Sequence, residues 1–198
     1  RHPSPLRQGN GGIVDYLNPE VAKRFIELTH EAYYRHLGEF FGETIPSIFY
    51  DEVSPYGSGC FSWTQALPAV FLEEKGYDIV ENLPHLFFDG GERTPKVRCD
   101  YWDVVTRLFV KSFMGQIADW CDAHGIALTG HTHEDSNLWP ICGNLFRTLR
   151  AQQWVGLDSL FGYKSYSSLK PAVSVAHVAG KEMVVCEALG LMGGWECT

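Results

Sequence analysis

Ile45-Pro46-Ser47-Ile48-Phe49-Tyr50-Asp51-Glu52 is the most informative stretch of this chain, because a short β-branched and aromatic run ends abruptly in two adjacent carboxylates. Pro46 bounds the run on one side and Ser54-Pro55-Tyr56-Gly57 bounds it on the other. These limits predict a short buried strand and not a helical segment. Such a strand delivers an acid to the edge of a sheet.

Two later stretches end in the same way. Ile126 to Thr129 runs into Gly130-His131-Thr132-His133-Glu134-Asp135, and Glu182 to Cys186 runs into Glu187. We expect these three carboxylate-tipped strands to converge on one site. At the first of them, strand alternation points neighbouring side chains in opposite directions. We expect Glu52 to face the cleft, which makes Asp51 secondary.

Helices are predicted between the strands. Asn18-Pro19-Glu20 is a strong helix start, and its helix runs to about Leu37. The longest periodic segment, Asp100 to Ala123, is typical of an amphipathic helix. Further elements are expected as a helix over 144–152, a strand over 154–160, and a helix over 169–179.

This alternation of strands and helices predicts parallel strands with right-handed crossovers. A nucleotide-binding sheet would show a glycine-rich phosphate loop, and the sequence contains neither G-x-G-x-x-G nor G-x-x-x-x-G-K. Acids at successive strand ends instead favour a TIM-type (β/α)8 barrel, an α/β fold whose catalytic groups come from the carboxyl ends of different strands. We expect residues 1–198 to form one incomplete barrel domain, about half a barrel, as an excerpt of a longer chain.

The composition and charge of the chain limit the kinds of partner that it can bind. A formal charge of −8 argues against a surface for nucleic acid or for an anionic membrane. Aromatic residues make up 14% of the chain, and such rings serve sugar-binding clefts as well as cores. The six cysteines form no C-x-x-C pair, so we interpret them as mostly reduced, buried thiols.

Glu52 and Glu187 are the candidate catalytic pair. Two carboxylates facing across a cleft can divide acid and base work on a glycosidic bond. Two βα units separate their strands, which would place them on opposing sides of a barrel mouth. Trp63 and Tyr56, in the long punctuated segment after the first strand, are candidates to line a pocket, or simply to pin that loop.

Several short motifs follow one another in an order that resembles the catalytic barrel of glycoside hydrolase family 106, the α-L-rhamnosidase-like enzymes. They are Phe49-Tyr50-Asp51-Glu52, Trp63-Thr64, Lys75-Gly76-Tyr77-Asp78, Asp100-Tyr101-Trp102, Ala127-Leu128-Thr129-Gly130-His131, and Cys186-Glu187-Ala188 after Ala176-His177-Val178-Ala179-Gly180-Lys181. The resemblance covers nearly the whole chain. Each motif alone is moderately specific, so the resemblance rests mainly on the order of the motifs.

The resemblance implies an inverting glycosidase acting on side chains of plant or microbial polysaccharides, often with calcium near the sugar. By position, Glu52 would end barrel strand four as the acid and Glu187 would end strand seven as the base, with the roles exchangeable. The implied partners are an oligosaccharide or glycoside substrate and the remainder of the same barrel with its accessory domains. The implied location is the bacterial periplasm or the exterior, with the cytoplasm as an alternative.

Two other functional classes stay open. His131 and His133 could chelate a metal as in amidohydrolase-type barrels, although the later His177 falls inside a helix. Otherwise His131 and Glu134 would contact sugar hydroxyls, or His131 would be structural. Asp158 would help to hold the sugar or cap a helix. The third class is a carbohydrate-binding barrel without catalysis, which the presence of both glutamates disfavours.

Overall fold

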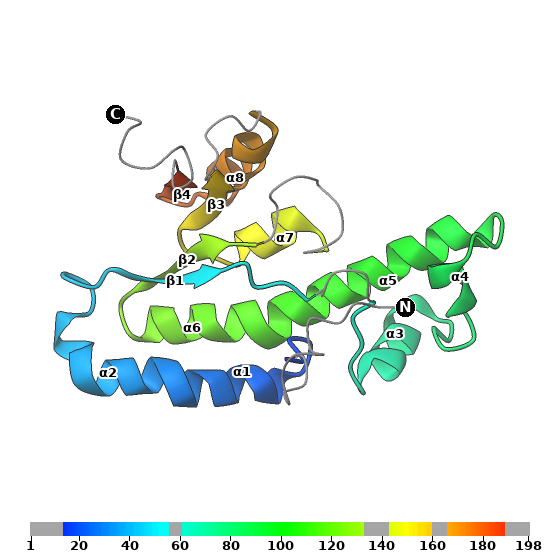
Figure 1. The fold of residues 1–198 in the computed structure, drawn as a ribbon, viewed down its shortest axis with the longest axis horizontal. Helices are drawn as coiled ribbons and strands as arrows, with labels where there is room; N and C mark the ends of the chain where they lie inside the picture. Colours follow the sequence, from blue (N-terminus) through cyan, green and yellow to red (C-terminus); the bar gives the residue numbers. More distant parts are fainter. Residues whose placement is uncertain (1–13, 56–60, 133–142, 160–165, 189–198) are drawn as a thin grey trace, which may run out of the picture.

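The computed structural model describes residues 14–55, 61–132, 143–159 and 166–188 of the chain. These residues form a mixed α/β fold in which parallel strands alternate with helices (Figure 1). The alternation predicted from the sequence is therefore confirmed. Within the described ranges the strands form two pairs and do not close into a barrel.

Both strand pairs are parallel. The strand β1 (Ser47–Asp51) pairs with β2 (Ala127–His131), and β3 (Val155–Ser159) pairs with β4 (Val184–Ala188). The register sets Asp51 opposite His131 and Asp158 opposite Glu187. Because parallel strands present their carboxyl ends at one edge, all four side chains reach the same end of the strands.

The two pairs meet where β2 lies beside β3. The backbone N–H of Trp154 donates to the Leu128 carbonyl at 3.2 Å. A Cβ atom at Gly156 would overlap the Gly130 backbone, and one at Gly130, which has a φ of 135°, would overlap the Tyr50 backbone. Glycine at these two positions therefore lets β1, β2 and β3 approach closely.

The first helix follows the sequence prediction closely. It comprises α1 (Pro19–Phe25), a π-helical turn η2 (Ile26–His30) and α2 (Glu31–Leu37), followed by a short 3₁₀ turn η3 (Gly38–Phe40). The Asn18 side chain caps it by accepting from the Glu20 N–H at 3.0 Å.

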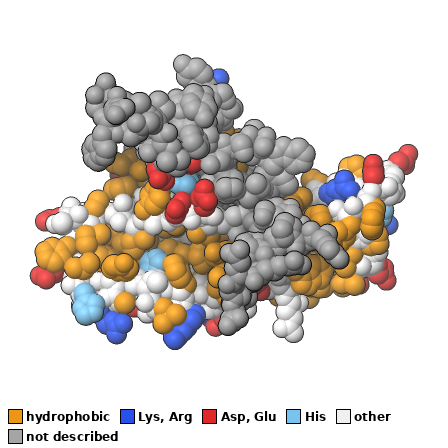
Figure 2. Space-filling view, viewed as in Figure 1, with side chains coloured by type: hydrophobic (Ala, Val, Ile, Leu, Met, Phe, Trp, Pro, Cys, Tyr) orange, Lys and Arg blue, Asp and Glu red, His pale blue; other side chains and the backbone are white. Residues whose placement is uncertain are grey.

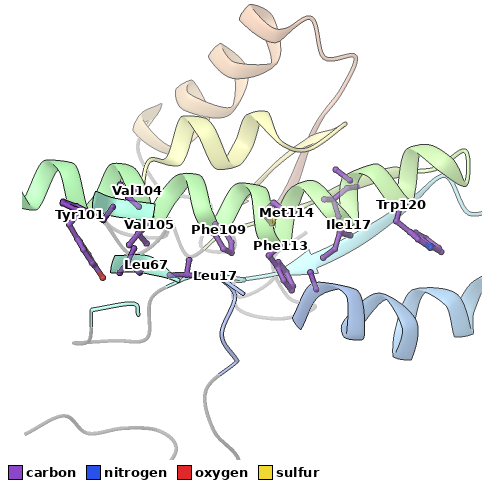
Figure 3. Packing of buried hydrophobic residues seen from close by; sticks show 14 of the residues in the cluster. Leu17, Leu67, Tyr101, Val104, Val105, Phe109, Phe113, Met114, Ile117 and Trp120 are labelled. Carbon is purple, nitrogen blue, oxygen red and sulfur yellow. The ribbon is translucent and has the colours of Figure 1, made fainter. Parts of the chain in front are cut away.

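A long continuous helix forms the centre of the molecule. It comprises α5 (Arg93–Phe109), a π-helical turn η4 (Val110–Met114) and α6 (Gly115–Ala123). It begins at Arg93 and not at the predicted Asp100, since Pro95 lies in the first turn, where a missing N–H removes no intrahelical hydrogen bond. Its apolar side chains build the larger core (Figure 3): Tyr101, Val104, Val105, Phe109, Phe113, Met114 and Ile117.

Shorter helices complete the two cores. The helices α3 (Leu67–Lys75) and α4 (Pro84–Phe87) pack on α5, and Gly76, with a φ of 75°, ends α3. The helices α7 (Leu145–Arg150) and α8 (Tyr166–Ala179) pack with β3 and β4 around a second core that contains Leu149, Val155 and Leu157.

An apolar groove of about 410 Å³ lies open between the first helix and β1, lined among others by Phe25, Tyr33 and Phe49. Figure 2 shows hydrophobic side chains in a band across this part of the surface. Phe25 and Leu28, which lie on the first helix, are 41% and 59% exposed. Apolar side chains of the first helix are therefore left open to solvent beside this groove.

The structure also shows how three of the cysteines are placed and whether a described helix could span a membrane. The thiols of Cys99 and Cys186 are exposed whereas that of Cys121 is buried, so burial of the cysteines was wrong for two of these three. No helix within the described ranges is both long and apolar enough to cross a lipid bilayer.

Candidate functional site

His131 lies at the carboxyl end of β2 between two acids from other strands. Its Nε2 donates to Glu187 Oε2 at 2.7 Å, and Asp51 Oδ1 lies 3.4 Å from the same nitrogen. The imidazole is only 2% exposed, whereas the side chains of Glu187 and Asp51 are 41% and 75% exposed. The cluster therefore has a buried base at its floor and two solvent-accessible carboxylates at its rim.

The strand register builds this cluster. Asp51 and His131 are partners across the β1–β2 pair, and Glu187 stands opposite Asp158 across the β3–β4 pair. Two local contacts then fix the imidazole. The Phe49 ring meets it edge-on at a centroid distance of 5.6 Å, and its Nδ1 lies 3.3 Å from the Thr132 carbonyl oxygen.

The charges of the cluster do not balance. One atom from each of Asp51, His131 and Glu187 lies within 4.8 Å of the other two. Even a doubly protonated imidazole cannot neutralise two ionised carboxylates, so the cluster carries net negative charge when both acids are ionised. Such an arrangement suits proton transfer or binding of a cationic or polarised centre.

Asp51, which was expected to be secondary, supplies the contact with His131, and Glu52 follows it at the end of the strand. The β1 strand stops at Asp51, and Glu52 has a φ of 48°, in the left-handed region that non-glycine residues seldom adopt. The alternation rule that favoured Glu52 therefore does not apply past the last strand residue. Within the strand, the same rule places Asp51 on the face of Phe49, and both contact His131.

The remaining predicted residues are distributed as follows. Asp158 is buried, 1% exposed, beside Glu187 in the strand register. Trp63 lies in the segment before α3, and it is 42% exposed. Tyr56, His133 and Glu134 fall outside the described residues, so their expected roles stay predictions.

Gln152 holds the strands behind the site together, and no sequence pattern had singled it out. It is fully buried, its Nε2 donates to the Tyr50 hydroxyl, and its Oε1 accepts from the Gly156 N–H at 2.7 Å. It thereby ties β1 to β3 across the β2 strand between them. The only signal was a polar residue in the short turn between α7 and β3, and turns contain many polar residues.

The calcium implied by the sequence resemblance does not match the cluster among the described residues. Calcium takes six to eight oxygen ligands. The cluster is instead centred on an imidazole nitrogen, with one oxygen contact from each of two acids. A nitrogen-centred set of this kind suits transition metals better than calcium, so no catalytic step is assigned to calcium here.

Parallel strands that gather carboxylates at their carboxyl ends define a class of catalytic α/β domains to which many glycoside hydrolases belong. Comparison with known families makes this specific. A family model described as alpha-L-rhamnosidase matches residues 1–196. The chain belongs to glycoside hydrolase family 106, as the sequence resemblance indicated.

Two relatives span nearly all of the chain. A protein of Formosa agariphila named "Putative beta-glucuronidase" is 25% identical over 98% of this chain. A rhamnosidase structure from Novosphingobium sp. PP1Y is 21% identical over 95% of it, with a TM-score of 0.69, which establishes a shared fold. The chain spans 16% of the length of the first relative and 19% of the second.

Proposed function

We propose that these residues form an arc of the catalytic (β/α)8 barrel of a glycosidase, and that Glu52 and Glu187 cleave the glycosidic bond with inversion. The observation that carries the proposal is the Asp51–His131–Glu187 cluster at the carboxyl ends of parallel strands in a chain of family 106. In barrels of this type, that end of the strands bears the catalytic groups.

Glu187 is the proposed general base. The hydrogen bond from His131 Nε2 engages its Oε2 at 2.7 Å and fixes the orientation of the carboxylate. Its Oε1 remains to accept a proton from an attacking water. His131 itself is a positioning residue in this scheme, because its ring is buried and its nitrogen is directed at the acids.

Glu52 is the proposed general acid, and geometry argues against giving this role to Asp51. Inverting enzymes keep their two carboxyl groups about 6.5 to 9.5 Å apart, which leaves room for a water. The contacting oxygens of Asp51 and Glu187 lie within 4.8 Å of each other, which is close to the roughly 5 Å typical of retaining pairs. An inverting reaction at this site therefore needs a partner for Glu187 beyond Asp51, and Glu52 is the next residue at the strand end.

An α-L-rhamnoside on a polysaccharide side chain is the proposed substrate, supported by the description of the family. A β-glucuronide is the second candidate, supported by the name of the Formosa agariphila relative. Trp63, Tyr56, Glu134 and Asp158 are the proposed substrate-binding residues, whereas His131, which the sequence placed among them, is buried and acts here through Glu187. The exposed indole of Trp63 is suited to stack on a sugar ring.

The open groove between the first helix and β1 supports the barrel part of the proposal. An aromatic groove beside an edge strand is a surface that a further βα unit would cover. We propose that the remainder of the barrel occupies it in the whole protein, so the 198 residues alone should aggregate.

The experiment is hydrolysis of aryl α-L-rhamnosides and aryl β-D-glucuronides by the whole protein and by Glu52→Gln and Glu187→Gln variants. We expect one substrate class to be cleaved, and each variant to lose most of that activity. The same assays with a chelator test the amidohydrolase-type alternative, in which removal of metal alone abolishes activity. Full rates in both glutamine variants would disprove the two-carboxylate proposal, and sugar binding without hydrolysis would favour a non-catalytic barrel.

A further inference from the structure

A basic pocket lies in the helix layer, on elements that supply no residue to the strand-end cluster. A cavity of about 560 Å³ between α5, η4 and α7 is lined by Arg107, Lys111, Arg147 and Arg150, with Glu74 as its one acid. All four cationic residues are exposed. Four cations around one cavity stand out in a chain whose formal charge is −8.

Ion pairing within the protein accounts for only two of these cations. Arg107 pairs with Glu74 and lies 3.6 Å from Asp103, and Arg147 pairs with Asp103. Within the described part of the chain, no ion pair involves Lys111 or Arg150. Two positive charges therefore remain at the cavity after the neighbouring acids have been used.

The positions of the four cations also bring like charges close to one another. Arg107 and Lys111 are four residues apart along one continuous helix, and Arg147 and Arg150 are three apart on α7. Like charges at these spacings face each other and destabilise a helix. Both like-charged pairs border one cavity, which increases the repulsion between the cations. An anion bound between them would relieve that repulsion.

We propose that this pocket binds an oxyanion, namely the carboxylate or sulfate group of an acidic polysaccharide, at a site separate from the strand-end cluster. The planar forks of Arg107, Arg147 and Arg150 match both oxyanions in a bidentate manner. Val110 and the aliphatic stems of the cations give the cavity an apolar wall against which a sugar ring can lie. The oxyanion assignment stands on the pocket alone, whereas the saccharide assignment rests on the proposed glycosidase function.

The test is isothermal titration of the whole protein at low ionic strength with oligogalacturonate, a sulfated oligosaccharide, a neutral oligosaccharide of equal length, and inorganic sulfate. The variant Lys111→Gln/Arg150→Gln removes the two unpaired cations. The matched control Lys23→Gln/Arg24→Gln removes two exposed cations that pair with Glu20 and Glu27 on α1.

We expect an acidic oligosaccharide to bind the unmodified protein, and the pocket variant to weaken that binding about tenfold or more, as lost charge-assisted hydrogen bonds would. The control variant should change the Kd less than twofold, and all three proteins should hydrolyse a small aryl glycoside equally. A preference for the uronate or the sulfated chain identifies the oxyanion. Equal binding of neutral and acidic chains, or equal weakening in both variants, would overturn the proposal. Binding of inorganic sulfate without either acidic chain would overturn the saccharide assignment. Loss of aryl glycoside hydrolysis in every protein would instead count against the glycosidase function.

Discussion

Two polar clusters in this molecule use the same kinds of side chain differently. In the helix layer, Asp103 contacts Lys75 and Arg147, with Arg107 at 3.6 Å. At the strand ends, a single imidazole, that of His131, faces the carboxylates of both Asp51 and Glu187. Cations outnumber the acid in the first cluster, and acids outnumber the base in the second.

We propose that this difference separates a stabilising cluster from a reactive one. Partial burial acts to raise the pKa of Asp103, but hydrogen bonds from Lys75 and Arg147 hold it below its ordinary value. That carboxylate is therefore kept ionised, and its oxygen atoms accept hydrogen bonds from the two cations. The strand-end acids share one donor and remain partly exposed, so they have oxygen atoms available for a substrate or a water. We infer that the first cluster holds helices together and the second performs the reaction.

The largest expected effect comes from Glu187→Gln. The amide keeps the size of the side chain and its capacity to accept from His131, but it cannot take a proton. We expect kcat to fall about 10²- to 10⁴-fold, the usual contribution of a general base, with the unfolding free energy changed by less than about 0.5 kcal/mol. Steady-state kinetics and chemical denaturation measure the two quantities. Glu182→Gln, an exposed position just before β4, is the control, and an equal loss in both variants would contradict the assignment.

A smaller effect is expected from Gly156→Ala, which tests whether the close contact between β2 and β3 places Glu187 against His131. The added methyl group would overlap the Gly130 backbone, so β3 and β4 must shift away from β2. Overpacking of this kind costs about 1 to 3 kcal/mol, and kcat should fall with stability. Gly180→Ala is the control, since a Cβ there has no atom within 4 Å and meets only the strain of a φ of 62°. An unchanged kcat in Gly156→Ala would show that the close contact between β2 and β3 does not position the site.

The smallest effect is expected from Asp103→Asn. We expect a loss of about 1 kcal/mol in unfolding free energy, typical of partly exposed ion pairs, with kcat unchanged. Because the folded pKa of Asp103 lies below its unfolded value, its contribution is present at neutral pH. That contribution disappears as the pH falls below about 4 through the folded pKa. Denaturation between pH 3 and pH 7 should therefore show a shallower acid loss in the variant, and a fall in kcat would remove the contrast between the clusters.

Much of this architecture could be predicted from sequence, because its signals are local. Asn18-Pro19 marks a helix start, Gly76 marks a helix end, and four short apolar runs mark the strands. The contact of His131 with Glu187 could not be predicted, since it spans 56 residues and depends on how β2 and β3 pack through two glycines. The place of Asp51 was missed because the strand ends one residue earlier than its run of residue types suggested.

The anomeric configuration of the first sugar released distinguishes the proposed pair of Glu52 and Glu187 from the alternative pair of Asp51 and Glu187. Proton NMR of the sugar released in the first minutes, before mutarotation, distinguishes inversion from retention. We expect the inverted anomer, with Glu52 and Glu187 as the pair, and we expect Asp51→Asn to produce it as well. A retained anomer would contradict the account and would instead favour Asp51 and Glu187, whose oxygens lie within 4.8 Å.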